Sequence, residues 1–169
     1  MGKRSSFARK ERDFYPTPYE AVLPLLPHLP PALVYDEPCA GEGDLIRHLQ
    51  KAGHRVDAHY DLAEGFDARA IQQCYGAMFI TNPPWPVTRG EPTLSIAKHL
   101  SELAPTWLLL SADFCHNLYF AEIAPRCQKI VSVGRVSWEG NGTKGKDNCA
   151  WYLFDLAHKG PTEFYGRSK

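Results

Sequence analysis

Apolar residues gather in short runs along the chain, and these runs predict the strands of a sheet. Residues 77–80 and 107–111 are almost continuously apolar, which is typical of parallel strands covered on both faces. Residues 55–60 alternate between polar and apolar side chains and predict another strand. Further strands are predicted at 33–37, 129–136 and 149–154.

Helices are predicted between these strands, the longest at 93–103, where leucine and alanine recur at helical spacing. Near the N-terminus, Thr17 as N-cap, Pro18 at the first helical position and Glu20 as a capping-box acid predict a helix that begins at Pro18. Prolines soon after it keep this helix short or kinked. Further helices are predicted at 45–49 and 114–124.

The order of these elements predicts the fold class. Strands alternate with helices, and two consecutive strands follow at 129–136 and 149–154. This pattern predicts a doubly wound α/β fold, with a mostly parallel, Rossmann-like sheet and an antiparallel C-terminal hairpin. We expect residues 1–12 to be a basic, flexible arm, residues 13–156 to form a single domain, and residues 157–169 to be a tail.

The composition is that of one globular domain, since 44% of the 169 residues are hydrophobic and 12% are aromatic. Nineteen basic residues balance nineteen acidic ones, which argues against a surface that is basic all over. The arm at 1–12 is nevertheless basic, and it either contacts phosphates or is simply solvated.

The cysteines and histidines suggest no metal site. Five cysteines form no C-x-x-C pair, and seven histidines are scattered, so we expect neither a metal nor a disulfide framework, and a reducing cytoplasm. The sequence has no signal-peptide pattern and no apolar run of about 18 residues, so we expect no membrane partner.

A glycine turn follows the predicted strand at 33–37. Gly41 and Gly43 lie between that strand and the next helix, where a ligand can approach bare backbone. Nearby acids, Glu37 among them, are unsuited to a pyrophosphate but suit a cationic amino group. A purely structural turn is the alternative.

Two aspartates follow the second strand. Asp61 lies 18 positions after Gly43 at the end of that strand, where an acid commonly binds ribose hydroxyls. Asp67 either reaches an adenine amino group or caps a helix at 68–73.

The segment Asn82-Pro83-Pro84-Trp85 leaves the strand at 77–80 as a stiff loop. Its side-chain amide, a backbone carbonyl oxygen that no neighbouring N–H group is expected to bond, and an aromatic ring can together hold a planar amino group. The alternative is a proline turn with a packed tryptophan. The glycine-rich loop at 138–148 either closes over a nucleotide, with Trp138, Lys144 and Lys146 contacting it, or is a plain hairpin loop.

Three motifs, in this order and spacing, resemble those of the amino-group methyltransferases that act on adenine N6. They are Phe14–Pro18 (FYPTP), Glu37–Gly43 (EPCAGEG) and Asn82–Trp85 (NPPW). The resemblance spans about residues 13–156 and is closest to small phage-type and bacterial DNA adenine methyltransferases. It implies the class I methyltransferase fold, S-adenosylmethionine as cofactor and a bacterial or phage-infected cell.

The resemblance also implies roles for individual residues. Glu37 would take the ammonium group of the cofactor, Asp61 its ribose and Asp67 its adenine ring. Asn82 and the carbonyl oxygen of Pro83 would accept the hydrogens of the target amino group, within a catalytic motif that includes Pro84 and Trp85, and Trp85 would stack on the base. The residues assigned to the cofactor are Phe14, Tyr15, Thr17, Pro18, Glu37, Cys39, Gly41, Gly43, Asp61, Leu62, Asp67 and Asn82.

The chain departs from the family in two respects. Trp85 stands where tyrosine or phenylalanine is more usual, and no residues remain for a separate target recognition domain. Sequence choice would then come from loops 87–92 and 138–148, from the basic arm or from a partner protein. Beside DNA, the substrate alternatives are RNA adenine and a protein glutamine amide. A non-catalytic subunit that binds the cofactor or nucleic acid is the remaining alternative.

Overall fold

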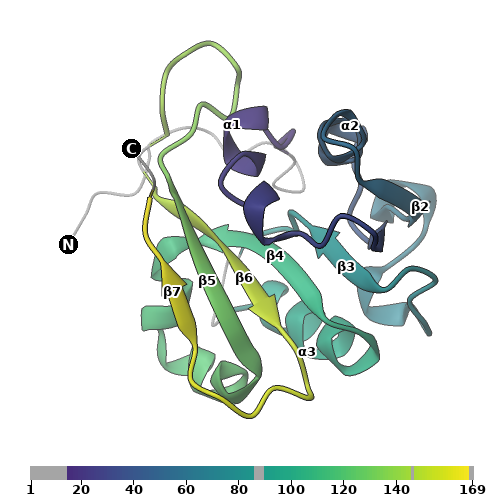
Figure 1. Ribbon diagram of the computed structural model, residues 1–169, viewed down its shortest axis with the longest axis vertical. Coiled ribbons are helices and arrows are strands. Elements are labelled where there is room, and N and C mark those ends of the chain that lie inside the picture. Colours follow the sequence, from purple (N-terminus) through teal and green to yellow (C-terminus); the bar gives the residue numbers. More distant parts are fainter. Residues whose placement is uncertain (1–14, 86–89, 146, 168–169) are drawn as a thin grey trace.

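A seven-stranded sheet forms the centre of the protein, with the strands in the order β2-β1-β3-β4-β6-β5-β7. The computed structural model describes residues 15–85, 90–145 and 147–167 (Figure 1). The strands are β1 (Val34–Glu37), β2 (Arg55–His59), β3 (Met78–Thr81), β4 (Thr106–Ser111), β5 (Cys127–Gly134), β6 (Cys149–Phe154) and β7 (Glu163–Tyr165).

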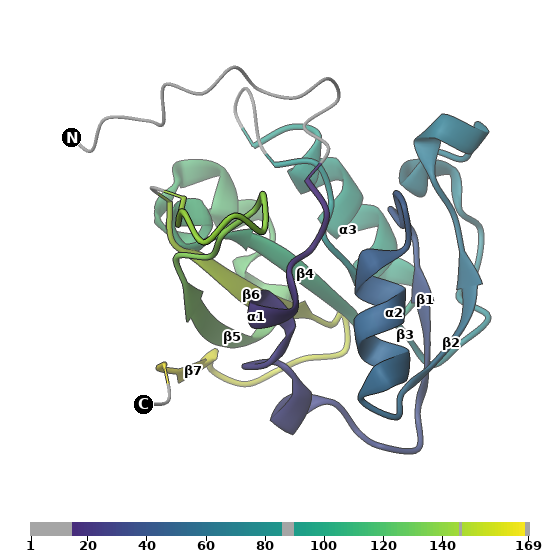
Figure 2. The same cartoon turned by 90° about the horizontal axis from the view of Figure 1, so that it is seen from above.

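Strand directions match the predicted fold class. β2, β1, β3 and β4 are mutually parallel, and β6 runs antiparallel to both β4 and β5. The predicted α/β sheet with an antiparallel C-terminal pair is therefore confirmed. β1, β3, β4 and β5 all end at the same edge of the sheet, which we call the carboxyl edge and which Figure 2 shows from above.

Helices cover both faces of the sheet. Alternate residues of β4 point to opposite faces, so Trp107 and Leu109 pack with α1 and α2, whereas Leu108 and Leu110 pack with α3. The α-helices are α1 (Tyr19–Val22), α2 (Asp44–Lys51) and α3 (Thr93–Leu103). None of the helices in the described part of the chain is long and apolar enough to span a membrane.

The helix predicted at 114–124 is wrong. The structure has three separate 3₁₀ turns there, because Asn117 is extended at φ −92° and ψ 148° and interrupts the helix. The 3₁₀ turns among the described residues are η2 (Leu26–His28), η3 (Leu62–Glu64), η4 (Ala68–Ala70), η5 (Ala112–His116), η6 (Leu118–Glu122) and η7 (Ala124–Arg126).

The predicted capping box at the start of the first helix is also wrong. α1 begins at Tyr19, its N-cap is Pro18, and no side chain caps it. The two groups expected to cap the helix are used elsewhere: the Thr17 hydroxyl accepts a hydrogen bond from Asn82, and the Glu20 carboxylate accepts one from Ser137. The N-terminal segment is thus tied to two other parts of the fold.

β7 was not predicted. It lies at 163–165, in the segment expected to be a tail, and pairs in parallel with β5. The strand has three residues, all of them exposed, and so short a segment has no alternation of buried and exposed positions from which it could be predicted.

A buried acid holds the segment that precedes β3. Asp36, in β1, is fully buried, and its carboxylate accepts hydrogen bonds from the backbone nitrogens of Tyr75 at 2.6 Å and Gly76 at 3.0 Å. A side-chain carbon at Gly76 would lie 2.6 Å from the carbonyl oxygen of Val34, so glycine is required there.

Candidate functional site

The predicted site residues gather where the order of the strands reverses. The chain passes from β1 to β2 on one side and returns to β3 on the other. Such a reversal leaves a crevice beside the carboxyl ends of the two central strands. Those ends are Glu37 and Thr81, and both residues are buried.

Glu37 is a buried carboxyl group with one oxygen that lacks a partner. Its side chain is 1% exposed, and Oε1 accepts a hydrogen bond from the backbone nitrogen of Cys39 at 3.1 Å. Within the described residues Oε2 is buried and has no hydrogen-bond partner. Burial raises the pKa of this carboxyl to about 8. A cationic amino group would give Oε2 the partner it lacks, so Glu37 fits the ammonium group of an amino acid moiety.

The glycine turn between β1 and α2 has two residues in the left-handed backbone region. Gly41 has a φ of 53° and Gly43 a φ of 78°, both in the left-handed region that favours glycine. Gly43 is the N-cap of α2. The turn therefore presents backbone without side chains next to the buried carboxyl of Glu37.

Asp61 joins this turn to the segment that follows β2. Its Oδ2 accepts a hydrogen bond from the backbone nitrogen of Gly41 at 2.8 Å, and its Oδ1 accepts one from Ala63 at 2.7 Å. Leu62, beside it, is 57% exposed. A carboxylate has about four acceptor sites, so Asp61 can still accept hydrogen bonds from hydroxyl groups.

Asp67 caps η4, the second of the two roles that the sequence left open. Its Oδ1 accepts hydrogen bonds from the backbone nitrogen of Arg69 and from Nε of the same residue, both at 2.9 Å. Hydrogen bonds from the Arg69 side chain are the main cause of its lowered pKa. A role at an adenine ring remains a prediction.

The side-chain amide of Asn82 is held in one orientation. Its Nδ2 donates to the Thr17 hydroxyl at 3.2 Å and to the Tyr15 carbonyl at 3.4 Å. A carbonyl oxygen can only accept, so the atom that faces Tyr15 is the amide nitrogen. The acceptor atom Oδ1 consequently points away from the N-terminal segment.

The segment Asn82–Trp85, which we call the elbow, is also fixed to α3 and β4. The Thr93 hydroxyl, fully buried at the start of α3, donates to the Pro84 carbonyl at 2.6 Å. The Trp85 indole nitrogen donates to the Leu109 carbonyl at 3.1 Å. The elbow expected from its two prolines is therefore held at both ends. Among the described residues, no hydrogen bond to the carbonyl of Pro83 is found.

Two tryptophans from distant segments meet at a right angle. The rings of Trp85 and Trp138 are 5.4 Å apart with an interplanar angle of 88°. The ring of Tyr15 lies 6.3 Å from that of Trp138. Trp85 and Trp138 are both partly buried against the core. Together they form an aromatic corner, by which name we refer to these two residues below.

Comparison with known proteins found no matching family model and no matching curated protein. Solved structures do match. A putative RNA methyltransferase from Pyrococcus horikoshii has a TM-score of 0.58 and 14% identity, over 90% of this chain and 92% of that chain. A modification subunit of a putative type I restriction enzyme from Vibrio vulnificus has a TM-score of 0.59 and 10% identity, over 92% of this chain. This chain spans about half (47%) of that subunit's length.

A third structure decides the fold. A putative class I S-adenosylmethionine-dependent methyltransferase from Listeria monocytogenes matches with a TM-score of 0.54 and 10% identity, over 89% of this chain and 64% of that chain. The chain has the class I methyltransferase fold. In this fold the crevice between β1 and β3 is the expected ligand site, and Glu37, the glycine turn, Asp61 and Asn82 all lie around it.

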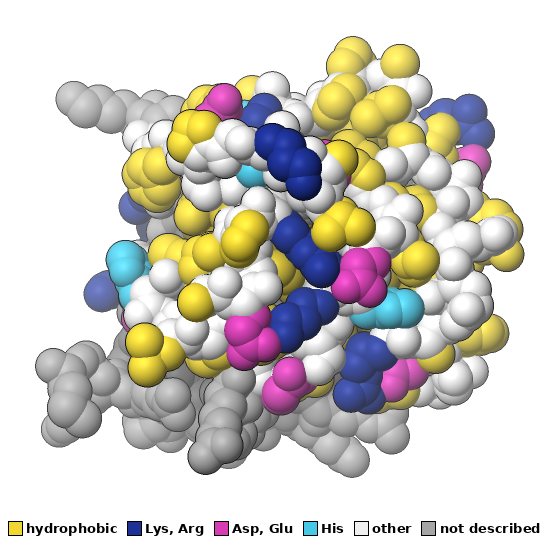
Figure 3. All heavy atoms as spheres, turned by 90° about the horizontal axis from the view of Figure 1, so that it is seen from below, with side chains coloured by type: hydrophobic (Ala, Val, Ile, Leu, Met, Phe, Trp, Pro, Cys, Tyr) yellow, Lys and Arg dark blue, Asp and Glu magenta, His cyan; other side chains and the backbone are white. Residues whose placement is uncertain are grey.

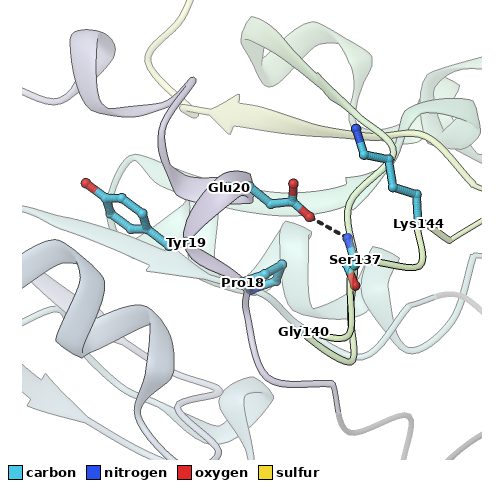
Figure 4. A pocket seen from close by; sticks show the side chains of 7 residues that line it. Pro18, Tyr19, Glu20, Ser137, Gly140 and Lys144 are labelled. Carbon is cyan, nitrogen blue, oxygen red and sulfur yellow. Dashed lines mark hydrogen bonds between the residues drawn. The ribbon is translucent and has the colours of Figure 1, made fainter.

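An open pocket lies between the start of α1 and the loop that follows β5. It has a volume of about 380 Å³, and Glu20 and Lys144 both contribute to its wall (Figure 4). Lys144 is exposed. Two candidates of the sequence prediction, Phe14 and Lys146, lie outside the described residues, as do residues 87–89 of the loop at 87–92.

Three residues of the site were missed by sequence reasoning. Thr93 anchors the elbow, and no local pattern predicts that contact. Glu20 and Ser137 join the N-terminal segment to the loop between β5 and β6. For Glu20 the only signal in the sequence was the expected capping box, which suggested that its carboxylate would bond the start of its own helix.

In the described part of the chain, no group of three or more His, Cys, Asp or Glu side chains could hold a metal ion.

Proposed function

We propose that this protein transfers a methyl group from S-adenosylmethionine to the exocyclic N6 amino group of adenine in nucleic acid, with DNA preferred over RNA. The observation that carries the proposal is the fixed amide of Asn82 at the carboxyl end of β3. Its nitrogen is held by Tyr15 and Thr17, so its oxygen is left to accept a hydrogen bond within the crevice.

The cofactor would be held by the residues around the glycine turn. Glu37 would accept the ammonium group, Asp61 the ribose hydroxyls, and the turn at Gly41–Gly43 would lie against the amino acid moiety. When bound, S-adenosylmethionine supplies an electrophilic methyl group on a sulfonium sulfur. The unpartnered Oε2 of Glu37 supports this arrangement, because a buried carboxylate oxygen requires a donor.

The chemistry that remains for the protein is to make an aromatic amine nucleophilic. The nitrogen lone pair of such an amine is delocalised into the ring. Asn82 Oδ1 and the Pro83 carbonyl would accept its two hydrogens and hold the lone pair toward the methyl group. This mechanism needs no strong base, and positioning lowers much of the barrier.

The aromatic corner supports a flipped base as substrate. An adenine inside a duplex cannot reach a buried crevice, so it must leave its stack. Stacking on an aromatic side chain offsets that cost by about 1–3 kcal/mol per base. Trp85 and Trp138 at 88° offer one ring for stacking and one for an edge contact.

The charges at the edge opposite the carboxyl edge argue against phosphate contacts there. On the opposite edge of the sheet, Lys and Arg side chains lie among acidic ones (Figure 3). Arg126 pairs with Glu102 at 3.0 Å, and Lys98 pairs with Glu122. Basic groups neutralised in this way attract phosphates weakly, whereas Lys144 lies on the loop beside the aromatic corner.

Names of the structural neighbours also support nucleic acid as the substrate. Besides the RNA methyltransferase and the type I modification subunit, a dimethyladenosine transferase from Plasmodium falciparum matches with a TM-score of 0.51. The modification subunit is by its name part of a larger enzyme. A partner protein that selects the target sequence is therefore part of the proposal.

Transfer of tritiated methyl groups tests this function. The protein would be incubated with labelled S-adenosylmethionine and, in parallel, duplex DNA, single-stranded DNA, RNA and protein. We expect label in DNA, and N6-methyladenine after digestion to nucleosides. Label in protein alone would contradict the proposal in favour of glutamine methylation. Tight cofactor binding without label in any substrate would favour a non-catalytic subunit.

A further inference from the structure

We propose that Glu20 is a positioning residue for the target base, because it holds Trp138 in the aromatic corner through the backbone of Ser137. The inference rests on the proposed function and adds a specificity role for a residue outside the crevice. Glu20 touches neither the elbow nor the glycine turn. It would act only through the loop that follows β5.

The bond from Ser137 to Glu20 joins parts of the chain that are 117 positions apart. The Ser137 backbone nitrogen donates to Glu20 Oε1, and the carboxylate points toward that nitrogen from the first turn of α1 (Figure 4). A hydrogen bond to an ionised acceptor is stronger than one between neutral groups. This bond is therefore a suitable anchor for a loop that lacks regular secondary structure.

The loop is folded around the residue that Glu20 holds. The backbone nitrogen of Gly140 donates to the Ser137 carbonyl at 3.2 Å, and the Ser137 hydroxyl bonds the side chain of Asn141 at 3.3 Å. The nitrogen, the carbonyl and the side chain of Ser137 are thus all engaged. Without the Glu20 carboxylate, the loop would lose its bond to α1.

Trp138 follows Ser137 directly, so its ring depends on this anchor. The ring contacts Trp85 on one side and Tyr15 on another. A side-chain carbon at Gly145 would lie 3.2 Å from the Trp138 ring, so the later part of the loop packs closely against the indole. Tyr15 also accepts the hydrogen bond from Asn82. Anchor, aromatic corner and catalytic amide therefore form one connected unit.

Three variants separate this role from a general effect on stability. Glu20→Ala removes the acceptor, Glu20→Gln retains an oxygen that can accept from Ser137, and Glu102→Gln is a matched control on α3. Glu102 is exposed, and its carboxylate pairs with Arg126 at 3.0 Å. Each variant would be compared with the wild type in thermal unfolding, in cofactor affinity, and in kcat and KM for a DNA oligonucleotide.

We expect Glu20→Ala to raise KM for the oligonucleotide about tenfold, the size expected for a lost hydrogen bond to a charged group. Cofactor affinity should change less than about twofold, because the crevice is intact. Glu20→Gln should recover most of the loss, and Glu102→Gln should behave as wild type. An unchanged KM in Glu20→Ala, or an equal loss of cofactor affinity, would overturn the proposal.

Fluorescence quenching by acrylamide tests the anchor without any activity. Of the four tryptophans, Trp107 and Trp151 are buried, so quenching reports on the aromatic corner. Glu20→Ala should increase the accessible fraction, and adding Trp138→Phe should remove that increase. If no nucleic acid is methylated, the proposed function fails while this comparison still tests the anchor. Equal quenching in Glu20→Ala and wild type would refute the anchor itself.

Discussion

The side-chain nitrogen of Asn82 lies 3.2 Å from the hydroxyl oxygen of Thr17, across 65 positions of sequence. The neighbouring Tyr15 carbonyl, 3.4 Å from the same nitrogen, decides which end of the amide faces the crevice. Rotating the amide would place its oxygen against that carbonyl, which can only accept, and would turn a donor toward the substrate. The N-terminal segment therefore belongs to the catalytic apparatus that we propose.

Replacing Asn82 by alanine should stop methyl transfer. Because the amide oxygen would polarise the target amine in the transition state, we expect kcat to fall by about 100-fold or more. Cofactor affinity should change little, and isothermal titration with S-adenosylmethionine would measure it. A variant with normal kcat would show that the amide is not part of the reaction.

Thr17→Val should reduce kcat without removing any group from the crevice. The valine has the shape of threonine but no acceptor for Asn82 Nδ2, so only the longer bond to the Tyr15 carbonyl remains and the amide is held less firmly. We expect a loss of about tenfold, the size of one lost hydrogen bond. Thr17→Ser keeps the hydroxyl and is the control. Equal losses in both variants would mean that the methyl group of Thr17, and not its hydroxyl, matters.

The buried carboxyl of Glu37 should make stability depend on pH. Its pKa is raised from 4.5 to about 8 by burial, so the folded protein keeps a proton that the unfolded chain releases. The contribution of Glu37 to the free energy of unfolding is therefore fully present below pH 4.5 and is lost as pH rises through about 8. When the free energy of unfolding is measured with urea across this pH range, it should change less with pH in Glu37→Gln than in the wild type.

Cofactor affinity should depend on the same carboxyl group, and it should rise with pH where the free energy of unfolding falls. The ammonium group requires an ionised Glu37, so affinity should rise with pH up to about 8, and binding below it should release a proton. Calorimetry in buffers of different ionisation enthalpy would count that proton. Glu37→Gln should bind more weakly and release none. Proton release that persists in this variant would assign it to another group.

Asp61→Ala should weaken cofactor binding at least tenfold, because it removes the acceptor for the ribose and also the bond from Gly41 that supports the turn. Asp57→Ala is a suitable control, since Asp57 is exposed on β2 and pairs with the exposed Arg55 of the same strand. The affinity of S-adenosylmethionine would be measured directly. Unchanged affinity in Asp61→Ala would show that the ribose binds elsewhere.

Thr93→Val should loosen the elbow from α3. The substitution keeps the buried shape but leaves the Pro84 carbonyl without its donor, and we expect the free energy of unfolding to fall by about 1 kcal/mol. Urea titration measures that change, and kcat should fall with it because the elbow carries Asn82. Thr93→Ser, which retains the hydroxyl, should keep normal kcat.

The sequence predicted those parts of the structure that depend on local pattern. Apolar runs such as 107–111 placed the strands, and the Asn82 elbow followed from its prolines. The contacts of Thr17, Glu20 and Thr93 could not be predicted in this way. Thr17 and Glu20 bond groups that are 65 and 117 positions away, and the local capping pattern suggested a different use for both. Thr93 bonds a carbonyl nine positions before it, across a loop whose path no local pattern predicts.

The position of β7 has a practical consequence for work with this protein. β7 is parallel to β5, so both strands lead toward the carboxyl edge, and the guanidinium of Arg167 lies so close to Gly134 that an added side-chain carbon there would be 2.8 Å away. The side chain of Arg167 therefore lies beside Gly134, where β5 ends and leads into the loop that carries Trp138. A bulky label attached at Arg167 would crowd the side of the molecule where we propose that nucleic acid binds, so labels for binding assays should be placed elsewhere.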